Sequence, residues 1–308
     1  IELFEQLIKK IQETGYDRYN SLRRPVAYEE FKGYKYDLHA EKVEIQDTKN
    51  TRYNINTIKG NITFENVSFK YSDKLPYVLK SINLEIKAGE TVAFVGRTGE
   101  GKTSLINLIP RLYDVTEGTV KIDGFDVKQI PIKVLRKNIG LVPQETFLFS
   151  DTLENNVLFG VKTKDRKVLL KAADIASLTK DVEQFTAGFN TILGEKGITL
   201  SGGQKQRTAL ARAIAVDPKI LILDDSFSAV DTNTEDEILG KLKDFMKGRT
   251  SLIISHRIST VKHADKIFVL NKGEIAEKGT HDELVELGGI YAEMNQKQLL
   301  EKELKELN

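Results

Sequence analysis

The spacing of hydrophobic residues divides the chain into a helical start, an α/β domain and a helical ending. At the N-terminus, IELFEQLIKKI places its apolar side chains on one face of a helix, and a poorly patterned stretch follows. From Asn61 the sequence NITFENVSFKY alternates between apolar and polar residues, as a strand with one buried face does. We therefore expect a helix and linker over residues 1–59, the possible end of a missing transmembrane domain, and a compact domain over residues 60–297.

Short apolar segments recur through the compact domain and predict its fold class. These segments are SINLEI, TVAFV, NIGLV, ILIL, TSLII and KIFVL. Helical patterns lie between several of them, which predicts an α/β fold with a mainly parallel sheet, and the early meander predicts an antiparallel β edge. Residues 145–217 contain helical patterns such as DRKVLLKAADIASL without a strong strand, so we expect an inserted α-helical subdomain there. Closing helices end in a helical tail at residues 298–308.

Composition narrows the class of protein only slightly. The chain has 308 residues, of which 40% are hydrophobic and 30% charged, and its net charge is +1. Such a balance gives no sign of a basic surface, and we expect no nucleic-acid partner. The chain contains no cysteine, which excludes disulfides and thiolate metal sites. No apolar run approaches the roughly 20 residues that a membrane-spanning helix needs.

The segment GRTGEGKT follows TVAFV directly and precedes a helical pattern. Strand, glycine-rich loop and helix in this order predict a phosphate-binding P-loop, in which backbone N–H groups point at phosphate oxygens. The alternative is a glycine-rich turn followed by an ordinary surface lysine. The predicted nucleotide-binding residues are Gly96, Arg97, Thr98, Gly99, Glu100, Gly101, Lys102, Thr103 and Ser104.

Two of these P-loop residues have individual expected roles. Lys102 would bridge the β- and γ-phosphates, and the Thr103 hydroxyl would ligate Mg²⁺. Asp224 ends the apolar strand ILIL, and an aspartate at this end of a strand beside a P-loop can hold the same metal through water. Alone, such an aspartate is common in α/β proteins.

The segment LSGGQ opens a second helix with a serine and two glycines, Ser201, Gly202 and Gly203. A helix N-terminus of this kind can bind an anion, because its first N–H groups are unsatisfied. The simpler alternative is that Ser201 only caps the helix while the glycines form a tight turn. The local sequence leaves both explanations open.

Taken together, these segments resemble the nucleotide-binding domain of ATP-binding cassette (ABC) transporters over roughly residues 60–297. GRTGEGKT resembles the Walker A motif, ILILD the Walker B motif and LSGGQ the family signature. The resemblance implies a P-loop NTPase core and the cofactors ATP and Mg²⁺. It also implies a head-to-tail dimer with a second nucleotide-binding domain, in which Ser201, Gly202, Gly203 and Gln204 bind the ATP held by the partner.

The resemblance assigns roles to four further residues. Tyr71 in FKYSD matches the aromatic residue that stacks on adenine, and Gln144 in LVPQE matches the glutamine that contacts Mg²⁺ and the attacking water. Asp231 in SAVD matches a loop that approaches the facing domain, and His256 matches the switch histidine at the γ-phosphate. Without the resemblance, Tyr71 and His256 would be interpreted as packing or structural residues, and Asp231 as a helix cap.

Three segments resemble the exporter type of this family in particular. They are VPQETFLFSDTLENNVLFG, TILGEKG and GTHDELVELGGIYAEMNQKQ. An exporter domain would contact the coupling helices of a transmembrane domain and lie at the cytoplasmic face of the cell membrane. The alternatives are an importer ATPase subunit, a soluble ABC ATPase and a regulatory ATP-binding module without turnover.

Asp225 departs from the pattern of strongly active family members, which carry a glutamate after the Walker B aspartate. That glutamate orients or deprotonates the hydrolytic water. Asp225 is one methylene shorter, and a displacement of roughly 1 Å can cost on the order of a hundredfold in rate. We therefore expect tight ATP binding with slow turnover, as in the degenerate half of a heterodimeric exporter, and favour a heterodimer over a homodimer.

Replacement of Lys102 tests the P-loop assignment. Lys102→Ala should weaken ATP binding, because the loop loses the cation that pairs with the β- and γ-phosphates. Titration calorimetry of the variant and the unchanged chain measures the effect. Equal ATP affinity in both proteins would refute the assignment.

Overall fold

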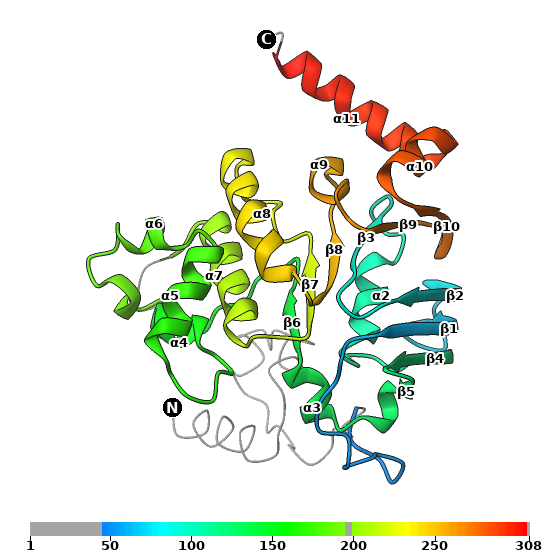
Figure 1. Cartoon of the computed structure of the whole chain (residues 1–308), viewed down its shortest axis with the longest axis horizontal. Coiled ribbons are helices and arrows are strands. Elements are labelled where there is room, and N and C mark those ends of the chain that lie inside the picture. The colour runs from blue at the N-terminus through cyan, green and yellow to red at the C-terminus, as the bar shows by residue number, and fades with distance from the viewer. Residues whose placement is uncertain (1–44, 195–198, 307–308) are drawn as a thin grey trace.

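The computed structural model describes residues 45–194 and 199–306, in which helices surround two β-sheets (Figure 1). The larger sheet consists, in spatial order, of β10 (Glu274–Gly279), β9 (Lys266–Asn271), β3 (Thr91–Val95), β8 (Thr250–Ile254), β7 (Ile220–Asp224) and β6 (Ile139–Val142). Its neighbouring strands are parallel except for the pair β10 and β9. This arrangement confirms the predicted α/β fold with a mainly parallel sheet.

The smaller sheet is antiparallel and forms from the early alternating segments. Its spatial order is β2 (Leu79–Ile86), β1 (Ile62–Phe69), β4 (Glu117–Ile122) and β5 (Phe125–Asp126). In β1, Ile62 and Phe64 are buried, whereas Glu65 is exposed. The predicted antiparallel β edge is therefore a separate sheet, which packs beside the parallel one.

Helices lie on both faces of the larger sheet and extend beyond it (Figure 1). The α-helices of the described residues are α2 (Lys102–Leu108), α3 (Ile132–Lys137), α4 (Leu153–Val157), α5 (Arg166–Ile175), α6 (Thr179–Val182), α7 (Gly202–Ala215), α8 (Thr232–Met246), α9 (Ile258–Val261), α10 (His281–Leu287) and α11 (Ile290–Glu306). Two short 3₁₀ helices are η3 (Val127–Gln129) and η4 (Gly188–Asn190).

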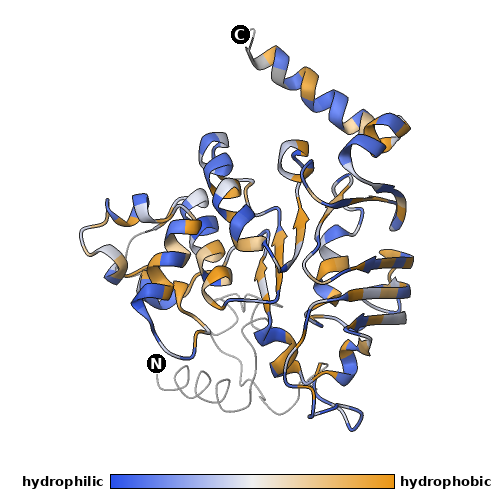
Figure 2. Cartoon of the chain, in the orientation of Figure 1, coloured by the Kyte–Doolittle hydropathy of each residue, from blue (hydrophilic) through white to orange (hydrophobic). Residues whose placement is uncertain are grey.

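Alternate residues of β3 face two different hydrophobic cores. Val92 and Phe94 pack with α2 between the two sheets, whereas Ala93 and Val95 pack with α7 on the other face. Strands that are buried on both faces become continuous apolar runs, and Figure 2 shows this as orange along the central strands. The helices α2 and α7 consequently lie on opposite faces of the larger sheet (Figure 1).

The segment expected to form a helical subdomain contains α4, α5, α6 and α7. The helix α7 packs against α5 and α4 on one side and against β6 on the other. Among the described residues of this segment, one isolated β-bridge joins Thr152, the N-cap of α4, to Ile192, which follows η4. The helical subdomain is therefore attached to the sheet mainly through α7.

The two ends of the compact domain differ from simple flanking tails. The helix expected from IELFEQLIKKI lies outside the described residues, but residues 45–59 run along the domain surface. There the backbone N–H of Arg52 donates to the Gln129 carbonyl oxygen at 2.7 Å. At the other end, the expected boundary at residue 298 falls inside the continuous helix α11. Within the described ranges, no helix is both long and apolar enough to cross a bilayer.

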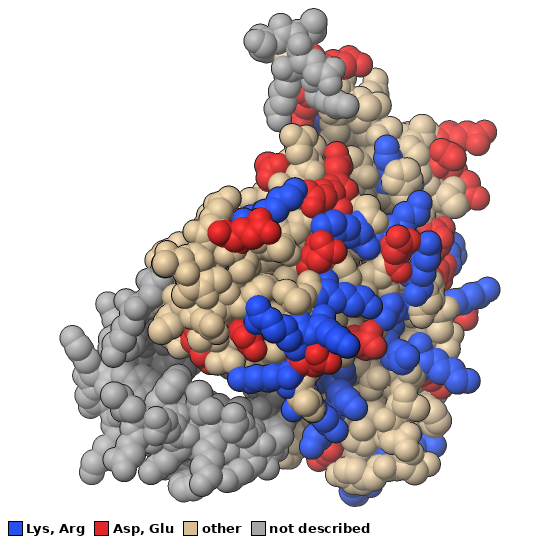
Figure 3. All heavy atoms as spheres, turned by 60° about the vertical axis from the view of Figure 1, so that its left-hand side comes forward, with Lys and Arg blue, Asp and Glu red and all other residues tan. Residues whose placement is uncertain are grey.

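Charged side chains of both signs lie beside one another on the surface that Figure 3 shows. Many charged side chains of the described residues form ion pairs, such as Lys241 with Asp174 at 3.0 Å and Arg249 with Asp217 at 2.6 Å. Exposed ion pairs of this kind contribute little to stability. Positive and negative side chains thus lie close together, in keeping with the net charge of +1.

Asp123 fastens the end of the linker to the turn between β4 and β5. Its carboxylate accepts hydrogen bonds from the backbone N–H groups of Lys59 at 2.6 Å, Gly60 at 3.1 Å and Asn61 at 3.0 Å. Its backbone is left-handed, with φ of 53°, a conformation that Asp and Asn adopt more readily than other non-glycine residues.

Asp123→Ala should lower the free energy of unfolding by about 2 kcal/mol, because three backbone donors lose a charged acceptor. Asp123→Asn serves as the matched control, since it keeps one acceptor oxygen and tolerates the left-handed backbone. Urea unfolding of the three proteins measures the difference. A change of less than about 0.5 kcal/mol in the alanine variant would contradict the role of Asp123.

Candidate functional site

The carboxyl ends of the parallel strands bring most of the predicted site residues to one edge of the larger sheet. Phe94 of β3 pairs in register with Ile254 of β8, which pairs with Asp224 of β7. The loop that begins at Gly96 and the residue His256 each lie two positions beyond these paired residues. The edge therefore gathers the glycine-rich loop, both aspartates and the histidine, and Gln144 follows β6 in the same way.

The glycine-rich loop needs its glycines for different physical reasons. Gly96 has φ of 147°, and a Cβ atom there would lie 2.4 Å from the Leu270 carbonyl oxygen. At Gly101, with φ of 93°, a Cβ atom would lie 3.0 Å from the Val78 carbonyl oxygen. Gly99 also has positive φ, but nothing lies within 4 Å of its Cβ position. The loop thus packs tightly on the strand side and is open on the other.

Lys102 lies at the start of α2 and turns back over the loop. Its side chain is almost fully buried, and Nζ donates to the carbonyl oxygens of Gly96 and Arg97 at 2.8 Å each. Burial lowers the pKa of Lys102, and the negative charges of Asp224, Glu100 and Asp225 partly oppose this shift. Among the described residues, the hydrogen-bond partners of this ammonium group are neutral carbonyls, so its charge is available for a phosphate.

Asp224 and Thr103 form the oxygen donors of a candidate metal site. The pKa of Asp224 is raised to about 6, mainly by burial, and the charge of the neighbouring Asp225 acts in the same direction. A hydrogen bond with Thr103 and the charge of Lys102 oppose this rise. A carboxylate beside a hydroxyl suits Mg²⁺, which prefers hard oxygen ligands and keeps several waters. The residues present therefore fit a magnesium ion next to the loop.

Asp225 follows in an unusual backbone conformation. Its φ is 45°, in the left-handed region, and its N–H donates to the Ile254 carbonyl oxygen at 2.9 Å. Aspartate adopts this region more readily than glutamate does. The chain therefore turns sharply at Asp225, beside the strand that leads to His256.

Tyr71 lies beyond the end of β1 and remains 47% exposed. Its ring meets Phe69 and Tyr113 edge-on, at centroid distances of 4.9 and 5.2 Å. Its hydroxyl forms a hydrogen bond of 2.7 Å with the Ser104 hydroxyl of α2, and burial raises its pKa. Three contacts thus hold an exposed aromatic ring beside the P-loop helix, as a platform for a planar ring requires.

The second predicted anion site begins with a complete capping box. The Ser201 hydroxyl accepts from the Gln204 N–H at 3.3 Å, and the Gln204 side chain accepts from the Ser201 N–H at 3.0 Å. Gln204 also donates to Asp181 at 3.2 Å, which accepts two further bonds from Arg207. The sequence left open whether Ser201 binds an anion or only caps the helix, and the structure shows that it caps α7.

The start of α7 is joined to the loop before α8 by Gln206, which the sequence did not single out. Its side chain donates to the Ser228 hydroxyl at 2.9 Å and accepts from the Ala229 N–H at 3.0 Å. A Cβ atom at Gly203 would lie 2.9 Å from the Ala229 carbonyl oxygen. Gly203 is therefore needed for close packing of the start of α7 against the loop before α8.

Asp231 ends this loop as the cap of α8. Its carboxylate accepts from the Thr234 N–H at 3.0 Å, and this contact lowers the pKa of Asp231.

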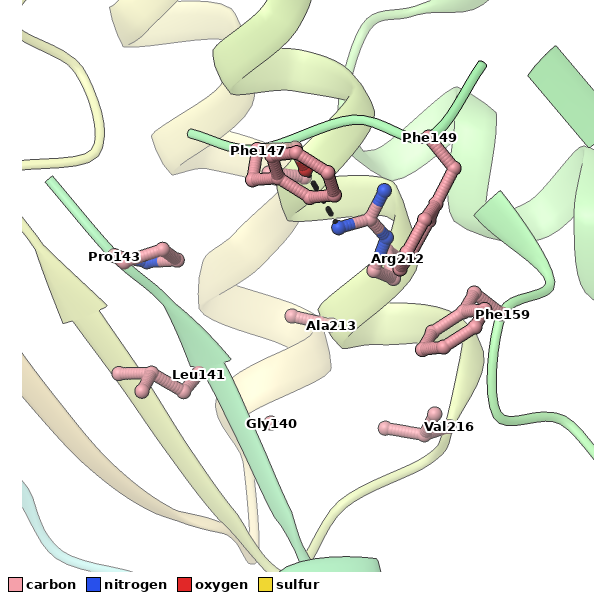
Figure 4. A pocket seen from close by; sticks show the side chains of 10 residues that line it. Gly140, Leu141, Pro143, Phe147, Phe149, Phe159, Arg212, Ala213 and Val216 are labelled. Carbon is pink, nitrogen blue, oxygen red and sulfur yellow. Dashed lines mark hydrogen bonds between the residues drawn. The ribbon is translucent and has the colours of Figure 1, made fainter. Parts of the chain in front are cut away.

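An aromatic pocket lies between β6, the segment after Gln144 and α7 (Figure 4). Phe149 and Phe159 pack together on one side of Arg212, with ring centroids 4.5 Å apart. The Arg212 guanidinium carbon lies 5.6 and 5.9 Å from these two centroids. Arg212 also donates to the Phe147 carbonyl oxygen at 2.9 Å, and the Phe147 side chain is 49% exposed. Aromatic residues that sequence alone would assign to a core therefore line a surface pocket. Part of the TILGEKG segment, residues 195–197, lies outside the described ranges.

Known proteins resemble this chain in sequence and in fold. The family described as "ABC transporter" matches residues 79–228. A solved structure of a bacterial Atm1-family ABC exporter with ATP bound is similar, with a TM-score of 0.78, 36% identity, and coverage of 84% of this chain and 46% of that one. This domain belongs to the ABC transporter ATPase family. The predicted family and P-loop NTPase fold are confirmed.

Curated relatives include ATP-binding transport proteins from several bacteria. An ABC transporter ATP-binding protein of Bacillus subtilis (strain 168) is 43% identical over 87% of this chain and 46% of its own length. An ATP-dependent lipid A-core flippase of Syntrophus aciditrophicus (strain SB) is 45% identical, over 81% of this chain and 41% of the flippase. A putative multidrug export ATP-binding/permease protein of Staphylococcus aureus (strain NCTC 8325 / PS 47) is 48% identical, over 76% of this chain and 40% of its own length. The chain spans less than half the length of these relatives.

The raised pKa of Asp224 predicts a pH-dependent stability difference. Because its pKa is about 6 in the folded chain and 3.8 without burial, the charged carboxylate destabilises the folded state above about pH 6. This penalty, about 3 kcal/mol from the difference in pKa, disappears below about pH 4. Nucleotide-free Asp224→Asn should therefore exceed the original chain in stability at neutral pH and match it at about pH 4.

Urea unfolding at both pH values tests this expectation. Asp236→Asn is the matched control, because Asp236 is exposed on α8 and should show no such pH-dependent difference. A stability difference that is equal at both pH values would show that the Asp224 carboxylate is not destabilised by burial.

Proposed function

We propose that this chain is the ATP-binding and hydrolysing part of an ABC exporter. The observation that carries the proposal is the single sheet edge at which Lys102, Asp224, Asp225 and His256 follow neighbouring strands. P-loop ATPases use this arrangement because phosphoryl transfer needs positioning and charge stabilisation more than covalent chemistry.

In this proposal, the described residues divide the work of nucleotide binding. The loop from Gly96 to Gly101 and Lys102 bind the phosphates, and Tyr71 stacks on the adenine ring. Thr103 and Asp224 hold Mg²⁺, which when bound neutralises charge on the phosphates. Asp225, Gln144 and His256 orient the attacking water and the γ-phosphate.

The position of α7 supports a head-to-tail dimer. The P-loop helix α2 and the signature helix α7 pack on opposite faces of the larger sheet. The Ser201 tip is thus suited to the nucleotide of a second ABC domain, and Gln206 keeps this tip and the loop before Asp231 in one unit. The binding energy of ATP then joins the two domains, and hydrolysis separates them.

The aromatic pocket around Arg212 is the proposed contact with the transmembrane part of the exporter. It lies beside Gln144 and includes the exposed ring of Phe147, so a coupling helix seated there would be adjacent to the nucleotide site. The greater length of the relatives leaves room for such a part. The domain would then lie at the cytoplasmic face of the membrane.

Asp225 makes a slow site the preferred interpretation. Its left-handed backbone fits aspartate, but the shorter side chain holds the carboxylate farther from the water than a glutamate would. A heterodimer would place the faster site on the partner, with Ser201, Gly202 and Gly203 of this chain completing it. The second candidate is a module that binds ATP without hydrolysing it, because the short side chain of Asp225 also fits a site without turnover.

Substitution of Asp225 distinguishes these functions. Asp225→Glu should raise the steady-state rate of phosphate release by up to about a hundredfold, because the longer side chain reaches the attacking water. Asp217→Glu is the matched control, since Asp217 has a similar left-handed backbone, with φ of 49°, but lies at the end of α7. The control should hydrolyse ATP at the original rate.

A second arm adds an ABC domain that carries glutamate at the equivalent position. Stimulated hydrolysis in this mixture supports the heterodimer. No gain in Asp225→Glu and no stimulation by the added domain would favour the passive module over the ATPase.

A further inference from the structure

One glutamine of the C-terminal helix α11 forms hydrogen bonds with the backbone at both ends of residues 256–258, the loop that follows β8. The Gln298 side-chain nitrogen donates to the carbonyl oxygen of His256 at 2.6 Å. The oxygen of the same amide accepts from the backbone N–H of Ile258 at 2.8 Å. Both ends of the amide are therefore used, and they bracket the loop at residues 256 and 258.

The bond to Ile258 also caps the short helix α9. This helix begins at Ile258 and has four residues, and its N-cap residue Arg257 makes no side-chain capping bond. A helix of one turn is unstable alone, so a cap supplied by another element has a large effect on the loop before it. Gln298 supplies that cap from 40 residues away.

The helix α11 is itself firmly attached to the domain. Tyr291 is completely buried, and its hydroxyl forms a hydrogen bond of 2.8 Å with His281. Glu277 of β10 accepts from the backbone N–H groups of Ile290 and Tyr291. Gln298 thus extends from a fixed helix, although the outer part of α11 projects away from the sheet (Figure 1).

A buried carboxylate fixes the same loop from the other side. Glu235 of α8 accepts from the Thr260 hydroxyl at 2.6 Å and forms an ion pair with Arg257. These contacts hold residues 257 and 260, whereas the side-chain hydrogen bond to the His256 carbonyl oxygen comes from Gln298. Glu235 and Gln298 therefore bind different residues of the loop.

We propose that Gln298 is a positioning residue for His256, so that α11 is part of the ATPase site rather than a solvated tail. This inference rests on the proposed role of His256 at the γ-phosphate. Loss of the Gln298 amide leaves the His256 carbonyl oxygen and the start of α9 without these hydrogen bonds, so the His256 side chain can shift. A shift of about 1 Å in a reacting group costs on the order of a hundredfold in the rate of ATP hydrolysis.

Gln298→Ala removes both hydrogen bonds, and Gln298→Glu keeps the acceptor for Ile258 while losing the donor to His256. Both variants should release phosphate at least about tenfold more slowly with ATP affinity unchanged within about twofold, because the phosphates are held elsewhere. The matched control is Gln296→Ala, an exposed glutamine of the same helix, which should behave as the original chain.

A measurement without turnover follows the histidine itself. The chain has four histidines, so NMR of the imidazole resonances, assigned with His256→Ala, resolves His256. Gln298→Ala and Gln298→Glu should shift the His256 resonance, and Gln296→Ala should not.

Unchanged His256 resonances and turnover in both Gln298 variants would overturn the inference while leaving the proposed function intact. Normal turnover in His256→Ala would instead remove the proposed role of His256. Slower turnover together with a lower melting temperature in Gln298→Ala, but neither change in Gln298→Glu, would also overturn the inference, because only the helix cap would then matter.

Discussion

The parallel pairing of β3, β8 and β7 fixes where the candidate site residues of this domain can lie. In one line of the register, Phe94, Ile254 and Asp224 stand side by side. Each strand leaves the sheet within two residues of that line, so three loops from distant parts of the sequence begin at the same place. Open α/β sheets bind ligands at such carboxyl edges because several loops converge there.

Burial at this edge shifts two opposite charges in the direction of neutrality. It lowers the pKa of Lys102 and raises that of Asp224, since both charged forms lose hydration. Neither group has a full countercharge within the described residues at hydrogen-bond distance, and their mutual attraction only reduces the shifts. A nucleotide phosphate and a metal ion would supply the missing charges.

Side chains from outside the motifs hold the functional loops in place. Gln206 joins the signature helix to the loop before α8, Glu235 binds the loop after β8, and Gln298 reaches that loop from the C-terminus. Each uses two polar atoms of one side chain on two separate targets. Such double contacts fix a loop more firmly than single bonds, because one loss of side-chain entropy supports two interactions.

The sequence alone determined the α/β class, the P-loop and the aspartate at the end of β7, because periodicity and glycine spacing are local properties. By resemblance, it also assigned candidate roles to Tyr71, Ser201 and His256. It could not identify Gln206 or Gln298, since a glutamine in a helix has no local sign of its distant partners. Only the tertiary structure decided that α2 and α7 lie on opposite faces of one sheet, that Asp225 has a left-handed backbone, and that α11 contacts the loop of His256. These features depend on packing between segments far apart in the chain, which no local pattern encodes.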